Sequence, residues 1–190
     1  LKLTGTPAQS AAQHGAFVRG RLHETALPVL AEKNIHLFRQ VLSRPLFDVV
    51  KVIYDLTVKK GVKRLTDQER LLGREFSTAA GINEDVFWRA MSQPDIMMVL
   101  VRLSLLRWMV GELPAMALPG CTSGVALAKH TRSKKIIACR NLDYPIVGTW
   151  EKNTTVLFHE PVGTSEIPHV TVSSLGFHTS SMSAMNREGL

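Results

Sequence analysis

The sequence predicts an α+β protein in which helices come first and strands follow. Up to Gly111, apolar residues recur at helical spacing. Beyond Pro114, short runs rich in β-branched residues alternate with turn residues. Segregation of helices and strands along a chain is typical of the α+β class. The 190 residues can form one domain with a real core, or a domain with a helical appendage.

The first half contains start and stop signals for several helices. Leu1 to Thr4 is a candidate strand that could pair with a sheet, and a helix is expected from Pro7. Pro28 suits a first helical position and predicts a second helix to about Ser43. A third helix follows the i, i+3, i+4, i+7 rule at Leu46, Val49, Val50, Ile53 and Leu56, with Gly61 just past its end.

The next helix has a capping box, with Glu69 three residues after Thr66, and should reach Ala80. Asn83 and Pro94 suggest further starts. The longest apolar stretch, Ile96 to Val110, contains two arginines and is shorter than the roughly 20 residues that span a bilayer. We therefore expect no membrane span.

The second half reads as strands. Val125 to Leu127 and Ile136 to Cys139 bracket a charged tip, which predicts a β-hairpin with a buried body. Two more runs, 154–159 and 169–173, predict strands, and a last one begins at Ser183. We expect these strands to be antiparallel and Cys139 to lie in the core.

The chain is basic, with 23 Lys and Arg against 16 Asp and Glu, a net charge of +7. Its two basic groups, 59–64 and 129–135, are not interleaved with the aromatic residues of a single-strand nucleic-acid platform. We expect no nucleic-acid partner, although a basic α+β binding module stays open as an alternative. No histidine shows metal-ligand spacing, so no metal and no cofactor are expected.

Two cysteines occur, so a disulfide framework is excluded. Cys121 follows Gly120, a residue without Cβ whose carbonyl is open to attack. The hairpin returns Arg140 and Asp143 towards the start of the first strand. A nearby guanidinium increases the fraction of a cysteine thiol that is ionised to thiolate. A carboxylate can hold an ammonium or a guanidinium in place. These residues indicate a cysteine nucleophile.

Three segments, 119–124, 139–144 and 185–190, resemble the cysteine N-terminal-nucleophile (Ntn) hydrolases. That group includes choloylglycine hydrolases, penicillin V acylases, acid-ceramidase-like amidases and isopenicillin N acyltransferases. Gly5-Thr6-Pro7 with Gln13-His14-Gly15 is similar to the acyltransferase branch. Tyr144 stands where the family commonly has Trp, and Ala11 where it usually has glycine.

The resemblance implies an αββα sandwich, with a helical pro-region over 1–120 and a catalytic part over 121–190 that stay associated. It implies autocatalytic cleavage between Gly120 and Cys121, which makes Cys121 the N-terminal nucleophile. Arg140 and Asp143 would support that nucleophile, and Asn186 would line the oxyanion site. The substrate would be a small N-acyl amide, which is hydrolysed or whose acyl group is transferred. We expect the natural protein to continue past Leu190, where further active-site residues of the family would lie.

Plainer interpretations stay open. Cys121 could be a small buried hydrophobe, Arg140 and Asp143 a strand-end ion pair, and Asn186 a turn residue before Gly189. His14 is interpreted as structural. A catalytically silent relative used for binding is the main alternative function. No signal peptide is visible, and the compartment and the oligomeric state, a homo-oligomer included, stay open.

Overall fold

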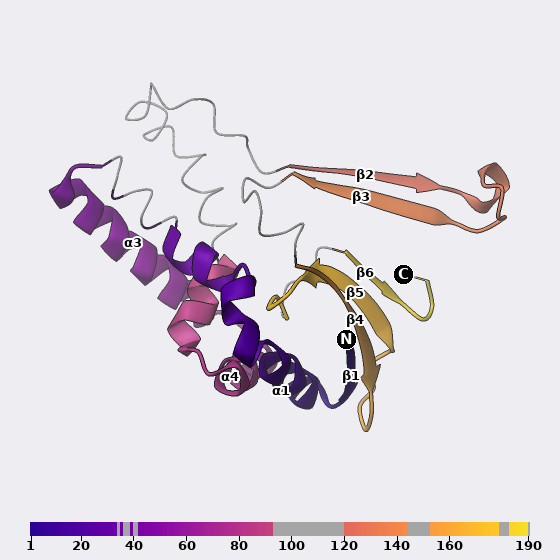
Figure 1. Ribbon diagram of the computed structural model, residues 1–190, viewed down its shortest axis with the longest axis horizontal. Coiled ribbons are helices and arrows are strands. Elements are labelled where there is room, and N and C mark those ends of the chain that lie inside the picture. The colour runs from indigo at the N-terminus through magenta and orange to yellow at the C-terminus, as the bar shows by residue number, and fades with distance from the viewer. Residues whose placement is uncertain are drawn as a thin grey trace.

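The computed structural model describes residues 1–33, 35, 39, 42–92, 120–143, 153–178 and 183–189. It confirms the α+β class: helices pack beside one four-stranded sheet, and a separate two-stranded hairpin extends away from both (Figure 1). The sheets are open, and the αββα sandwich stays a prediction. In the described part of the chain, no helix is long and apolar enough to cross a membrane.

The four-stranded sheet joins the two ends of the sequence. Its strands lie in the order β1 (Lys2–Gly5), β4 (Thr154–Pro161), β5 (His169–Ser174) and β6 (Ser183–Asn186). The expected pairing of the first residues with the sheet is confirmed, since Leu3 lies opposite His159. The β1–β4 pairing is parallel, whereas β4–β5 and β5–β6 are antiparallel. The antiparallel pairing expected of the later strands is therefore confirmed. No orientation was predicted for β1, which comes from the other half of the chain and pairs in parallel.

Helix α1 (Pro7–Val18) begins where the sequence predicts. Thr6 and Gln9 form a capping box that satisfies backbone N–H groups at its start. The chain continues as a 3-10 turn over Arg19–Glu24. The helix expected from Pro28 begins at Leu27, and its residues Val29–Lys33 form a π-helical turn. The remainder of that expected helix lies largely outside the described residues.

Helix α3 (Arg44–Val62) includes Gly61, which was expected just past the end. Helix α4 (Asp67–Ala80) has the predicted capping box and ends at Gly81, whose φ of 73° is the left-handed conformation that glycine accepts. The helix expected from Asn83 is present over 84–92. The side-chain oxygen of Asn83 accepts a hydrogen bond from the backbone N–H of Asp85 at 2.7 Å. The start expected at Pro94 and the apolar stretch 96–110 lie outside the described residues.

The core lies among the helices and against one face of the sheet. Helices α1 and α4 cross closely at Gly15, where an added Cβ would lie 2.3 Å from the carbonyl oxygen of Phe76. The fully buried large apolar side chains of this core are Leu3, Val18, Leu27, Leu30, Phe76, Phe87 and Leu157. On the other face of the sheet Val156, Phe158, Val172 and Met185 are exposed.

Strands β2 (Gly120–Ala126) and β3 (Ile137–Asp143) form the predicted hairpin, with a 3-10 turn, Ala128–His130, at its tip. The prediction of a buried body was wrong: Val125, Ile136 and Ile137 are more than half exposed. Cys139 is likewise exposed rather than in the core. The hairpin is a sheet of its own, and among the described elements its main contacts are between its own two strands, so its side-chain faces stay open.

Candidate functional site

The hairpin brings four of the five predicted site residues into one ladder. Gly120 lies opposite Asp143, Cys121 opposite Leu142, and Ser123 opposite Arg140. The bond between Gly120 and Cys121 therefore lies at the open end of the hairpin, where β2 begins and β3 ends. The sequence predicts the hairpin, because two apolar runs bracket a charged tip, and the turn at that tip sets the register of the two strands.

Strand alternation assigns these positions to faces of the ladder. Positions 121 and 123 share a face with their partners, 142 and 140, while position 143 belongs to the opposite face with position 120. Position 140 is thus a diagonal neighbour of position 121. Arg140 is exposed, and its guanidinium is charged at any working pH. The structure describes the backbone, but not the side chains, of Cys121, Leu142 and Asp143.

Asn186, the fifth predicted residue, lies in the other sheet. It ends β6 and pairs with His169 of β5. Its carbonyl oxygen accepts a hydrogen bond from the N–H of Gly189 at 3.1 Å, in a turn where Gly189 has a φ of 86°. The backbone of Asn186 therefore shapes a turn, and the structure does not bring this residue into the ladder of Cys121.

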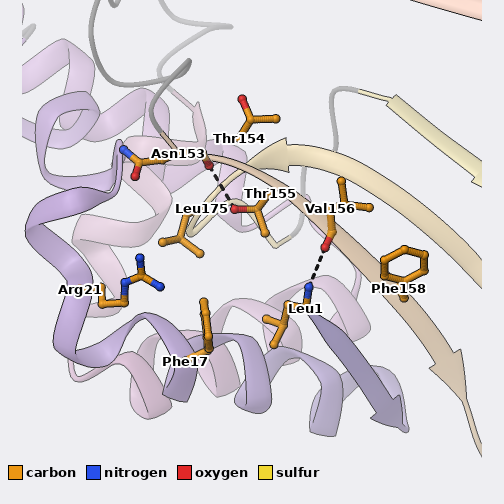
Figure 2. Close-up of a pocket in the computed structure, with 9 residues that line it drawn as sticks. All are labelled: Leu1, Phe17, Arg21, Asn153, Thr154, Thr155, Val156, Phe158 and Leu175. Atoms are coloured by element: carbon orange, nitrogen blue, oxygen red, sulfur yellow. Dashed lines mark hydrogen bonds between the residues drawn. The ribbon is translucent and has the colours of Figure 1, made fainter.

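A cavity of about 500 Å³ lies between α1, the 3-10 turn after it and the start of β4 (Figure 2). Its described lining combines apolar and polar groups and includes none of the five predicted site residues: Leu1, Phe17, Arg21, Asn153, Thr154, Thr155, Val156, Phe158 and Leu175. The guanidinium of Arg21 lies over the ring of Phe17, 5.5 Å from its centroid, and pairs with Glu24. Arg21 is therefore already engaged within its own turn.

A second arrangement was missed by the sequence analysis: four of the seven histidines form one cluster. His159 and His169 face each other across β4 and β5 and stack with centroids 4.3 Å apart. The ring centroid of His178 lies 5.9 Å from that of His159 and 5.4 Å from that of His14 of α1. We call these four residues the histidine cluster. Their only sequence signal is local, since three of them occur between positions 159 and 178.

Hydrogen bonds determine which ring nitrogens carry protons in the buried part of the cluster. The N–H of Gly176 donates to Nε2 of His14 at 3.4 Å, so the proton of a neutral His14 sits on Nδ1. His14 Nδ1 then donates to Nδ1 of His178, 3.2 Å away. Phe76 of α4 closes the site, with its ring edge-on to His14 at 5.3 Å. Both contacts require neutral imidazoles.

Burial and mutual repulsion keep these imidazoles neutral. Burial, then the charge of His159, lowers the pKa of His14 to about 4. Burial, then the charges of its neighbours, lowers the pKa of His178 to about 3, and burial with His169 lowers that of His159 to about 4. No group of three or more metal-binding side chains in the described ranges could hold a metal ion.

Comparison of the chain with protein-family models, with curated proteins and with solved structures finds no match.

Proposed function

We propose that this protein is a self-processing cysteine Ntn amidohydrolase or acyltransferase, with Cys121 as its nucleophile. The observation that carries the proposal is the register of the hairpin. Its open end combines a glycine–cysteine bond at the start of one strand with an arginine and an aspartate at the end of the other. The resemblance of the segments around Cys121, Arg140 and Asn186 to that superfamily also supports the proposal.

The first step is the cleavage of the chain. The thiol of Cys121 attacks the carbonyl carbon of Gly120, and the bond from that carbon to the nitrogen of Cys121 breaks as the nitrogen takes up a proton. Water then hydrolyses the resulting thioester. The products are a carboxylate on Gly120 and a free α-amine on Cys121. Gly120 favours this attack because it carries no side chain beside its carbonyl.

The second step is turnover of a small N-acyl amide. The new α-amine has an ordinary pKa near 8, so at neutral pH it can take the proton of the Cys121 thiol. The thiolate attacks the amide carbonyl, the amine leaves with a proton, and an acyl thioester forms. Water completes hydrolysis, whereas a second amine completes acyl transfer. Arg140 favours the thiolate, Asp143 holds the α-ammonium, and Asn186 donates to the oxyanion.

Two experiments together test Cys121 as the nucleophile: a screen for N-acyl amides that the protein hydrolyses, and alkylation of the Cys121 thiol. Iodoacetamide should abolish hydrolysis of the responsive N-acyl amides, and Cys121→Ala should lack that hydrolysis from the start. Cys139→Ala is the matched control, since Cys139 lies on the paired strand and is exposed; this variant should keep full activity. Cys121 that neither reacts with iodoacetamide nor supports hydrolysis would instead favour the catalytically silent relative.

A further inference from the structure

We propose that the histidine cluster is an acid-sensitive contact that docks α1 onto the four-stranded sheet and opens when its imidazoles take up protons. The cluster lies where the two halves of the chain meet. His14 belongs to α1, whereas His159, His169 and His178 belong to β4, β5 and the segment that follows β5. This inference does not depend on the proposed enzymatic activity.

Each buried hydrogen bond of the cluster is lost when its acceptor is protonated. Nε2 of His14 accepts a hydrogen bond from the backbone N–H of Gly176. A proton on Nε2 would make it a donor as well, so that two N–H groups would face each other with no acceptor. Nδ1 of His178 accepts from His14 in the same way. An orphaned buried donor costs about 1–3 kcal/mol, besides the cost of the buried charge. Protonation therefore removes the two polar contacts between α1 and the segment after β5.

The groups that face the cluster do not offset these charges. Besides burial, the groups that shift the pKa values of His14, His159 and His178 are His14, His159, His169 and the α-amine of Leu1, and all of them lower the values. No carboxylate of the described residues is among the groups that shift them. From α4 the packing partner is Phe76, which cannot compensate a positive charge by ion pairing.

The direction of the pH effect follows from the lowered pKa values. An imidazole with an ordinary pKa near 6.5 in the open form and about 4 in the docked form binds its proton more tightly in the open form. Docking is therefore fully supported above pH 6.5 and weakens as the pH falls towards 4. Between pH 6.5 and pH 4, each such histidine lowers the ratio of docked to open molecules about tenfold per pH unit. His14 and His178 together lower that ratio about a hundredfold per pH unit.

Hydrogen exchange of the full chain carrying Cys121→Ala tests the proposal, because cleavage cannot then change the peptides. After correction for intrinsic exchange, acidification from about pH 7 to about pH 5 should deprotect α1 and β5 far more than α3. His178→Asn offers a side-chain oxygen to His14 without a titrating nitrogen. The protection of α1 should therefore fall with decreasing pH about tenfold less per pH unit in this variant than in wild type. His130→Gln, an exposed histidine on the hairpin tip, is the matched control and should behave as wild type.

Three outcomes would overturn the proposal: α1 stays as protected as α3 on acidification, His178→Asn loses protection as steeply as wild type, or α1 and α3 lose protection equally. If His178→Asn does not fold, nuclear magnetic resonance titration of the wild-type histidines decides instead. Two imidazoles with pKa values well below 6.5, whose protonation accompanies α1 exchange, support the contact. Ordinary values for all described histidines would exclude it.

Discussion

Gly120 lies directly opposite Asp143 at the open end of the β2–β3 ladder. The proposed scissile bond therefore begins a strand whose partner strand ends on a carboxylate, with Arg140 two positions from the residue opposite Cys121. A short antiparallel ladder can thus hold three of the groups that a self-cleaving cysteine needs.

Arg140→Gln should lower the reactivity of the Cys121 thiol. Loss of a guanidinium near a thiol raises the thiol pKa by about one unit or more, so the thiolate fraction at neutral pH falls about tenfold. The rate of iodoacetamide reaction, followed against pH by mass spectrometry of the Cys121 peptide, measures the change. Arg132→Gln at the hairpin tip is the control for net charge and should leave the profile unmoved. Equal profiles for both variants would remove Arg140 from the site.

Asn186→Ala should lower kcat for a responsive amide by about 10²–10³-fold and change KM little, because an oxyanion donor acts in the transition state. Asn141→Ala is the matched control on β3, one position from Arg140. Since Asn186 shapes a turn in the other sheet, thermal unfolding of both variants must accompany the kinetics. A fall in melting temperature with unchanged kcat would show that Asn186 is a turn residue only.

Gly15→Ala should destabilise the helical core by about 1–3 kcal/mol, because the new methyl group overpacks the crossing of α1 and α4. The methyl carbon would meet the carbonyl oxygen of Phe76 at 2.3 Å. Gly61→Ala in α3 is the opposite case: nothing lies within 4 Å of its added Cβ, and alanine should stabilise the helix by about 0.5–1 kcal/mol. Denaturant unfolding measures both, and a neutral Gly15→Ala would contradict the close crossing.

Tyr54 should make the helical core sensitive to alkali. Burial raises the pKa of its hydroxyl to about 12, and the hydroxyl donates to the carbonyl of Arg89 at 3.2 Å. The unfolded tyrosine loses its proton near pH 10, so stability falls as the pH rises from 10 towards 12, by up to about tenfold in the folding equilibrium per pH unit. Unfolding midpoints above pH 10 should fall less steeply for Tyr54→Phe than for wild type. Parallel slopes would show that Tyr54 titrates normally.

Local signals were sufficient for most of the elements. The capping box at Thr66, the end of α4 at Ala80 and the hairpin around its charged tip each depend on neighbouring residues and were predicted. The parallel pairing of Leu3 with His159 and the contact of His14 with His178 join residues more than 150 positions apart. Such partners leave no pattern in a single sequence.

The exposure of the hairpin shows a second limit. The apolar runs around Val125 and Ile137 predict strands, but they cannot say which element covers them. At the site, the hairpin register places Cys121 opposite the end of β3. The position of Asn186 depends instead on β6, which belongs to the four-stranded sheet. The histidine cluster was missed because only the long-range fold assembles it.

Intact-mass analysis of the full-length chain, beside Cys121→Ala and Cys139→Ala, shows whether Cys121 cleaves its own chain. Wild type and Cys139→Ala should split into two fragments, one ending at Gly120 and one beginning at Cys121, whose summed mass exceeds the precursor by one water. Cys121→Ala should stay whole. A wild-type chain that stays whole under conditions where it is folded, or a Cys121→Ala chain that splits at the same bond, would contradict the assignment of Cys121 as a self-processing nucleophile.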